Sequence, residues 1–384
     1  MTIARFSRRQ FMKAGGIGVF GALAFPANAW NRNRVLYVGT YTSGKSEGIY
    51  VYGFSPRVGG LATFESTKTI NPSFVTIDRS GRYLYAVNEV GEYEGKPGGY
   101  VSAFKIDYVT KNLTLLNQQA TQGADPCHLT VDSRRKALLV ANYTGGSITV
   151  LPVRPDGSLA PASDLKQHEG SGIKEQQKGP HAHCIVLDRL ERHAIIADLG
   201  IDKVMVYRFD RAARKLVPAK QPFAELQAGA GPRHLAFHPT GKYLYVINEL
   251  DSSMAAFKYN ELNATLTHIH TVSTLPGDFS GASFCADVHV SPSGKFLYGS
   301  NRGHNSIVVF EIDPRTGRLR LVEHVSTEGD WPRNFTIDPA GKFLLVANQR
   351  SDNVVTFKID QQTGRLRPTG YDEQIPSPVC LKFL

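Results

Sequence analysis

Five residues of chemically active types stand in four copies of one internal repeat. They are His183, Arg233, Glu249, Arg302 and Arg333. Histidine and glutamate accept protons, and arginine binds carboxylates and phosphates in a fixed geometry. If the fold brings the copies together, such a set predicts a site that binds or transforms a small molecule.

The repeat is clearest in residues 231–248, GPRHLAFHPTGKYLYVIN. Each copy has an apolar run, a turn and a second apolar run that ends on Asn or Asp, which is the pattern of two paired strands. A second anchor lies ten residues before that terminal residue in six copies: Asp78 to Asn88, Asp132 to Asn142, Asp188 to Asp198, His238 to Asn248, Ser291 to Asn301 and Asp338 to Asn348. The equal spacings indicate a repeated structural unit.

The period of the repeat predicts the fold. With Thr40 as the first terminal position, there are seven units at intervals of 47 to 56 residues, and each contains four strand-like runs. We therefore expect an all-β, seven-bladed β-propeller with four-stranded antiparallel blades, forming one domain over residues 30–384. The first unit lacks an inner strand and residues 378–384 resemble one, so we expect the C-terminal strand to close the first blade.

Residues 1–29 have the order of an export signal: a basic start containing Arg8 and Arg9, an apolar run over 14–25, and Ala27-Asn28-Ala29 as a cleavage sequence. The paired arginines resemble a twin-arginine signal, so the expected partner is the twin-arginine export machinery and the expected location is the periplasm. The apolar run is too short to span a bilayer. No stable membrane anchor is expected after cleavage.

Charge and cysteine content narrow the possible partners. Removing the four positive charges of residues 1–29 lowers the net charge from +10 to +6. The remaining Lys and Arg are scattered, which argues against nucleic acid and favours a small anion as partner. The spacing of the four cysteines fits no zinc site, and neither a metal nor a cofactor is expected. We expect buried single cysteines instead of disulfides: Cys127, Cys184, Cys285 and Cys380.

Positions on which all units agree are expected to serve the fold, and polar positions on which they differ are expected to serve function. Two such positions fall on loops at one end of the ring. The start of the inner strand contains His183, Arg233 and Arg333, and the residue after the terminal Asn gives Glu249 and Arg302. His181, His128 and Asp287 lie next to these positions and extend the candidate set.

Each candidate also has a structural interpretation. His183 could be a buried histidine with satisfied hydrogen bonds, and Arg233 with Glu249 could form a salt bridge within one blade. Exposed pairs of that kind add only about 0–1 kcal/mol, so stability is a weak reason for their placement. Arg302 and Arg333 could be solvated charges.

Several segments resemble a known family. They are PHAH at 180–183, GPRHLAFHP at 231–239, the Asn248-Glu249 pair, ADVHVSPSGK at 286–295 and WPRNF at 331–335. Together they resemble the seven-bladed β-propeller lactonases, a family that includes bacterial 6-phosphogluconolactonases and fungal carboxymuconate-cyclising enzymes. The resemblance covers nearly all of residues 34–384.

The resemblance implies a lactonase that hydrolyses an anionic or sugar-derived lactone by attack of water on the ester carbonyl. It places catalytic roles on His183, Arg233 and Glu249, with Glu249 or His183 as the base and Arg233 as the donor to the carbonyl oxygen. Substrate-binding roles fall on His181, His128, Asp287, Arg302 and Arg333. Arg302 and Arg333 are expected to hold a carboxylate or phosphate.

Two other functions remain open from the sequence. A cycloisomerase would use the same residues on a muconate-type diacid, and a noncatalytic propeller would only bind a ligand or a protein. The export signal also separates this chain from family members that act on cytoplasmic sugar phosphates. A gluconolactone-like substrate is therefore the adjusted expectation.

Overall fold

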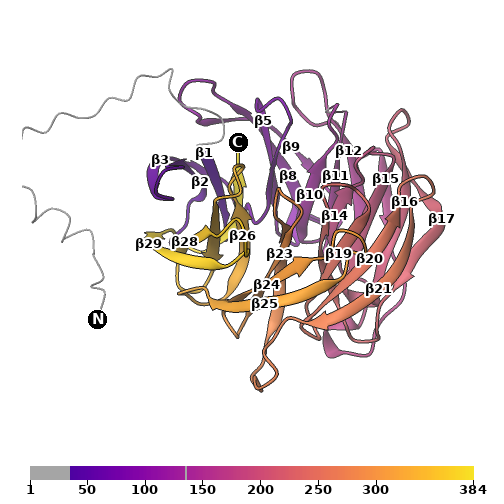
Figure 1. The fold of residues 1–384 in the computed structure, drawn as a ribbon. Coiled ribbons are helices and arrows are strands. Elements are labelled where there is room, and N and C mark those ends of the chain that lie inside the picture. The colour runs from indigo at the N-terminus through magenta and orange to yellow at the C-terminus, as the bar shows by residue number, and fades with distance from the viewer. Residues whose placement is uncertain (1–34, 135) are drawn as a thin grey trace, which may run out of the picture.

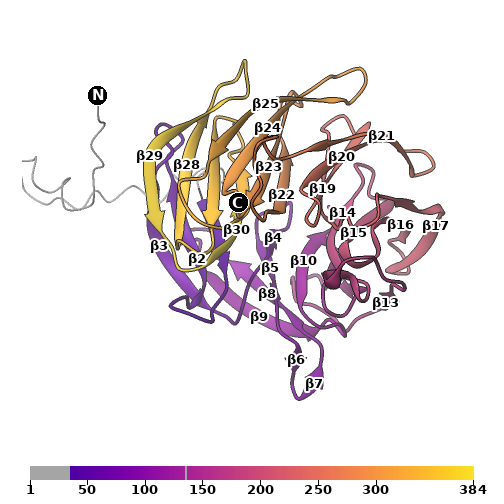
Figure 2. The same cartoon turned by 90° about the horizontal axis from the view of Figure 1, so that it is seen from below.

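The computed structural model describes residues 35–134 and 136–384, which form seven four-stranded antiparallel sheets arranged in a ring (Figures 1 and 2). The predicted β-propeller is confirmed. The expected export signal lies outside the described residues. Within them, helical structure amounts to two short 3-10 turns, η2 (Glu175–Gln177) and η3 (Leu199–Ile201).

The first three blades contain the following strands. Blade one has the order β3-β2-β1-β30 and is made of β1 (Val35–Thr40), β2 (Gly48–Phe54), β3 (Leu61–Lys68) and β30 (Pro378–Phe383). Blade two is made of β4 (Val75–Ile77), β5 (Tyr83–Asn88), β8 (Tyr100–Ile106) and β9 (Leu113–Ala120), with a small hairpin of β6 (Glu92–Tyr93) and β7 (Lys96–Pro97) inserted. Blade three is made of β10 (Pro126–Val131), β11 (Ala137–Asn142), β12 (Ser147–Pro152) and β13 (Asp164–Gln167).

The other four blades follow chain order from the innermost strand outward. Blade four is made of β14 (Ala182–Leu187), β15 (His193–Asp198), β16 (Lys203–Asp210) and β17 (Lys215–Glu225). Blade five is made of β18 (Pro232–Phe237), β19 (Tyr243–Asn248), β20 (Ser253–Asn260) and β21 (Thr265–Ser273). Blade six is made of β22 (Phe284–Val290), β23 (Phe296–Arg302), β24 (Ser306–Ile312) and β25 (Leu319–Ser326). Blade seven is made of β26 (Pro332–Ile337), β27 (Phe343–Asn348), β28 (Asn353–Ile359) and β29 (Leu366–Gln374).

The last strand closes the ring, as the sequence predicts. β30 pairs antiparallel with β1, and Leu36 lies opposite Phe383. This pairing supplies the inner strand that blade one would otherwise lack (Figure 2, yellow beside indigo). It therefore removes an unpaired sheet edge that could template aggregation.

The hydrophobic core lies between neighbouring blades. Leu244 and Phe257 of blade five pack in one buried cluster with Ile195 and Val204 of blade four. Both faces of a blade are covered in this way, so the second strand of each blade is buried along its whole length and consists largely of apolar residues. The β19 sequence YLYVIN, buried at every position, is an example.

In three blades, the residue that ends the second strand donates to a carbonyl of the segment before the blade. Asn301 donates from Nδ2 to the carbonyl oxygen of Thr274 at 2.9 Å, and Asn348 donates to that of Thr327 at 3.1 Å. The recurring Asn or Asp predicts a turn residue bonded to nearby backbone. The structure makes it the last residue of a strand, and its bonds differ between blades: Asp198 accepts from the nearby N–H of Gly200, whereas Asn142 and Asn248 donate to serine hydroxyls. The residue is architectural, as expected.

The four cysteines are buried and unpaired, as the sequence predicts. No helix among the described residues has the length and apolar character needed to cross a membrane.

Candidate active site

Inner strands begin, and second strands end, at one face of the ring, which we call the rim face. The register of each blade fixes this arrangement, because Pro232 at the start of β18 lies opposite Asn248 at the end of β19. Arg233 and Glu249 therefore emerge at the same level although they are sixteen residues apart. The same register operates in blade seven, where Pro332 lies opposite Asn348.

Glu249 joins two arginines from neighbouring blades. Its Oε2 atom lies 2.8 Å from Nε of Arg233 and 2.8 Å from Nη2 of Arg302. The Nε–H group of Arg233 is not aligned for a hydrogen bond, so its contact with Glu249 is an ion pair without a hydrogen bond. Oε1 of Glu249 has no hydrogen-bond partner among the described residues, and 18% of the side chain is exposed.

Backbone carbonyls of blade six hold both arginines in place. Arg233 donates from Nη1 to the carbonyl oxygen of Ala286 at 2.5 Å. Arg302 donates from Nε to Phe284 O at 3.1 Å and from Nη2 to Cys285 O at 3.0 Å. Because both side chains are almost fully buried, these bonds fix the guanidinium groups before any ligand arrives.

The charges of this cluster stabilise one another. Burial alone would raise the pKa of Glu249, but the guanidinium groups of Arg302 and Arg233 outweigh it and hold the pKa below its usual value. Burial lowers the pKa of Arg302 to about 10, and Glu249 partly opposes this shift. All three groups are therefore ionised at neutral pH.

His183 is a buried, neutral imidazole within electrostatic reach of this cluster. Its ring is 5% exposed and contacts the rings of Tyr143 and His234 at centroid distances of 5.4 and 5.3 Å. Nδ1 is buried and has no hydrogen-bond partner among the residues described. Burial and then the charge of Arg233 lower the pKa of His183 well below its ordinary value, so the ring carries no charge at pH 7.

His181 lies at the edge of the rim and not in the charge cluster. Its ring stacks on Tyr143 at 4.6 Å, and its Nδ1 lies 3.0 Å from the carbonyl oxygen of Tyr143. Its backbone N–H donates to Oδ1 of Asp198 at 2.8 Å, and Oδ2 of the same carboxylate lies 2.6 Å from Nδ1 of the buried His168. Asp198 thus fixes the loop that carries His181.

Arg333 belongs to a second cluster on the same face. It donates from Nη2 to the hydroxyl oxygen of Tyr41 at 2.7 Å, and that hydroxyl donates to Oε1 of Glu89 at 2.8 Å. Ser73 donates to the other oxygen of Glu89. Burial raises the pKa of Tyr41, with Glu89 adding to the effect, so the phenol stays protonated. Arg333 is thus engaged within the protein.

The sequence-based selection omits Tyr41 and Glu89, although a signal for both is present. Each follows the terminal residue of a second strand, the position that holds Glu249 in blade five and Arg302 in blade six. The sequence already places Glu89 at that position, and the first unit adds Tyr41. Glu89 in particular is the blade-two counterpart of Glu249.

His128 and Asp287 lie one layer deeper in the central channel. Asp287 accepts from Asn334 Nδ2 at 2.5 Å and lies 2.7 Å from His234 Nδ1 and 2.9 Å from His289 Nε2. The His128 ring packs against that of Phe74 at a centroid distance of 4.1 Å, tilted by 34°. Both line a cavity of about 330 Å³ that is walled by the inner strands. The structure therefore separates these two residues from the rim cluster, and their substrate-binding role remains a prediction.

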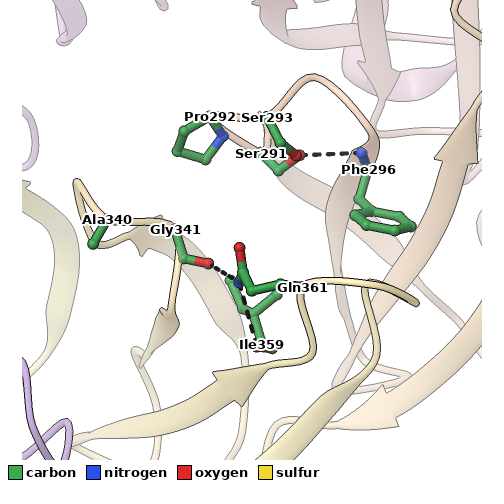
Figure 3. Close-up of a pocket in the computed structure, with 8 residues that line it drawn as sticks. All are labelled: Ser291, Pro292, Ser293, Phe296, Ala340, Gly341, Ile359 and Gln361. Carbon is green, nitrogen blue, oxygen red and sulfur yellow. Dashed lines mark hydrogen bonds between the residues drawn. The ribbon is translucent and has the colours of Figure 1, made fainter.

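A second hollow, of about 110 Å³, lies at the opposite end of blades six and seven (Figure 3). It is formed by the turn after β22, the turn after β26 and the end of β28, and its lining residues are Ser291, Pro292, Ser293, Phe296, Ala340, Gly341, Ile359 and Gln361. None of these side chains is ionisable. We therefore do not place acid–base chemistry there.

The rim cluster combines a carboxylate with an open oxygen, fixed guanidinium groups and a neutral imidazole. Neither Nη2 of Arg233 nor Nη1 of Arg302 has a hydrogen-bond partner among the described residues, so each can donate to a ligand oxygen. Within the described part of the chain, no group of three or more His, Cys, Asp or Glu side chains is placed to hold a metal ion.

Comparison with known proteins identifies the family. Residues 35–383 match the family model described as "Lactonase, 7-bladed beta-propeller". The chain belongs to this family. The lactonase resemblance drawn from the rim segments is thereby confirmed.

Individual members of the lactonase family are similar over most of their length. The 6-phosphogluconolactonase of Bacillus subtilis strain 168 is 39% identical over 349 residues, which cover 91% of this chain and 97% of that protein. A 6-phosphogluconolactonase of Formosa agariphila is 37% identical over 309 residues, covering 79% and 86%. The structure of the periplasmic gluconolactonase of Pseudomonas aeruginosa superposes with a TM-score of 0.87 at 37% identity, covering 91% and 98%.

Proposed function

We propose that this protein hydrolyses the lactone ring of a sugar-derived lactone, and that the cluster of Glu249, Arg233 and Arg302 is its catalytic centre. The observation that carries the proposal is the carboxylate whose Oε2 is fixed by two arginines while Oε1 is left open. The relatives named as lactonases support hydrolysis over cycloisomerisation or ligand binding alone.

The reaction begins when Oε1 of Glu249 takes a proton from water as the water oxygen bonds to the ester carbonyl carbon. Positive N–H donors are needed where the carbonyl oxygen becomes negative, and the free N–H groups of Arg233 and Arg302 supply them. One donor of this kind contributes roughly 3–4 kcal/mol to transition-state stabilisation. The ring carbon–oxygen bond then breaks, the ring oxygen takes the proton, and the product is an open hydroxy acid that ionises.

Accessibility favours Glu249 over His183 as the base. Nδ1 of His183 is buried, whereas the Glu249 side chain is partly exposed. The low pKa of Glu249 weakens it as a base but keeps it ionised. His183 then acts as a neutral support near the arginines, since a charged imidazole there would repel Arg233.

A pH-stat screen tests the proposal, because lactone hydrolysis releases one proton per turnover. The full chain and the chain from residue 30 onward should accelerate acid release from glucono-1,5-lactone or 6-phosphoglucono-1,5-lactone above the spontaneous rate. The absence of acceleration with any aldonolactone would refute it. Loss of diene absorbance from a carboxymuconate would instead indicate cycloisomerisation.

We also propose that residues 1–29 direct export to the periplasm through the twin-arginine machinery. The basic, apolar and small-residue order of the segment supports this, as does the similarity to a periplasmic gluconolactonase. Replacement of Arg8 and Arg9 by lysine should retain the full-length protein in the cytoplasm. Unchanged periplasmic recovery of this variant would contradict the proposal.

A further inference from the structure

Trp331 stands at a position where most blades have a left-handed backbone. In five blades the residue before the inner strand has positive φ: Asn71 (41°), Asp125 (52°), Gly231 (65°), Trp331 (67°) and Ser377 (44°). The carbonyl oxygen of each accepts a hydrogen bond from the residue after the terminal position of the second strand, which confirms that the five positions are equivalent.

The Trp331 ring lies 6.2 Å from that of Phe284, but the backbone conformation at this position does not favour a tryptophan. The other four residues are glycine or small polar types, and glycine, asparagine and aspartate tolerate positive φ best. A bulky residue in this conformation is a true outlier and costs free energy. Such strain is typical of sites that serve a ligand.

The indole of Trp331 contacts two arginines, of which one has a carboxylate partner and the other has none among the described residues. The Arg302 guanidinium carbon is 5.3 Å from the ring centroid, and that of Arg350 is 3.5 Å away. Arg302 is paired with Glu249. Arg350 is exposed, and no carboxylate of the described residues lies within 4.0 Å of it. Of the two arginines at Trp331, Arg350 is therefore the one whose charge has no carboxylate partner among the described residues.

We propose that Trp331 and Arg350 form a subsite for an anionic group that the substrate carries away from its lactone carbonyl. This inference rests on the proposed function. Stacking on the indole restricts the guanidinium plane but leaves its in-plane N–H donors free for the oxygens of a phosphate or carboxylate. Because Arg302 contacts the same ring, this subsite adjoins the arginine that is proposed to bind the lactone carbonyl oxygen.

The experiment compares kcat/KM of wild type and Arg350→Met on three lactones. The 6-phosphate of glucono-1,5-lactone carries a phosphate, glucaro-1,4-lactone carries a carboxylate, and glucono-1,5-lactone carries neither. We expect Arg350→Met to lower kcat/KM by about 10- to 100-fold for the lactone whose anion the subsite binds. This is the fold-change that corresponds to the loss of one charge-assisted hydrogen bond. The neutral lactone should change less than about threefold. An equal loss on all three, or no loss on any, would overturn the proposal.

Arg57→Met is the matched control. Arg57 is also exposed, and it lies in the turn after β2, at the opposite end of the ring from Tyr41. This control variant should retain the wild-type kcat/KM on all three lactones. A loss equal to that of Arg350→Met would show that net charge, and not the subsite, attracts the anion.

Trp331→Asn separates a ligand role from a structural one. Asparagine occupies the equivalent position in blade two, so this variant should keep or raise the melting temperature while losing the preference for the anionic lactone. A lowered melting temperature with an unchanged preference would mean that Trp331 serves packing only, and would overturn its part in the subsite.

Binding measurements distinguish failure of the subsite from failure of the proposed function. If no lactone is hydrolysed, calorimetric titration with 6-phosphogluconate, glucarate and gluconate still tests the subsite. Tighter binding of one of the first two than of gluconate, weakened at least tenfold by Arg350→Met, would support the subsite although the enzyme proposal had failed. No binding, or binding unaffected by the substitution, would overturn it.

Discussion

Arg302 and Glu249 come from neighbouring blades and are joined through a single carboxylate oxygen, with Nη2 of Arg302 2.8 Å from Oε2 of Glu249. Arg233 approaches the same oxygen from within blade five. The protein thus binds Oε2 of Glu249 and leaves Oε1 open to a ligand or water. It also makes Glu249 the group on which two buried charges depend.

Replacing Glu249 by glutamine should abolish most of the activity. Removal of a positioned base lowers kcat by about 10²- to 10⁴-fold. Stability should fall too, because two buried guanidinium groups lose their partner, and breaking a buried ion pair costs about 3–5 kcal/mol. Thermal melting and pH-stat kinetics measure the two effects separately.

Glu311→Gln is a suitable comparison for Glu249→Gln. Glu311 also pairs with an arginine, Arg320, but on the outer strands of blade six, where the two side chains are 43% and 76% exposed. Its replacement should alter neither kcat nor the melting temperature measurably. Full activity of Glu249→Gln would exclude Glu249 as the base.

The pH–rate profile should have its acid limb below the ordinary glutamate range. The two arginines hold the pKa of Glu249 low, and His183 is neutral at all pH values above its own lowered pKa. kcat/KM corrected for spontaneous hydrolysis should therefore be flat between about pH 5.5 and 7.5, with no inflection near the usual histidine pKa of about 6.5. A clear inflection there, lost in His183→Gln, would identify His183 as the base.

The protein should lose stability in mild acid. Burial lowers the pKa of His234 to about 4 and lowers those of His128 and His183 well below the ordinary value. The unfolded chain therefore binds more protons than the folded one between the unfolded pKa near 6.5 and the lowered folded values. The stability that the neutral histidines contribute is complete above about pH 6.5. It is lost as the pH falls, by on the order of 3 kcal/mol for His234 alone.

Melting temperatures measured from pH 7 to pH 4 check this expectation. His268→Gln, at an exposed histidine on β21, should leave the pH dependence unchanged. A melting temperature that stays constant down to pH 4.5 would show that the channel histidines are not held neutral.

Deleting residues 378–384 should open the ring. The deletion removes β30 and leaves β1 without its inner neighbour, so the truncated chain is expected to aggregate or to melt at a much lower temperature. Lys382→Ala keeps the strand and should be stable. Retention of wild-type solubility and melting temperature by the truncated chain would contradict the role of β30.

The sequence was sufficient for the fold because the repeat is regular and every strand pair of the blades except β1 with β30 is local in sequence. The terminal Asn248, the turn at Gly241 and the closing segment 378–384 all lie where the pattern predicts. Contacts between blades are harder to predict, because they depend on side-chain reach across sheets. The shared use of Glu249 by Arg233 and Arg302 is such a contact.

The repeat pattern of the sequence did not predict how deep in the channel each candidate residue lies. His183 and Cys184 are adjacent in sequence, yet each residue along an inner strand lies about 3.3 Å further along the channel, so neighbouring positions reach different depths. His128 and Asp287 consequently lie with His234 below the rim. A residue that is next to a rim residue in the sequence therefore need not lie at the rim.

The pairing of Leu36 with Phe383 joins positions separated by almost the whole described chain. Contacts of such long sequence separation form late, because their loop-closure entropy must be overcome before they contribute stability. Blade one is thus the last to be completed during folding, and a newly made chain remains an open arc until its final strand is available. Whatever delays that strand delays the assembly of the entire rim, since the rim residues of blades one and seven meet only in the closed ring.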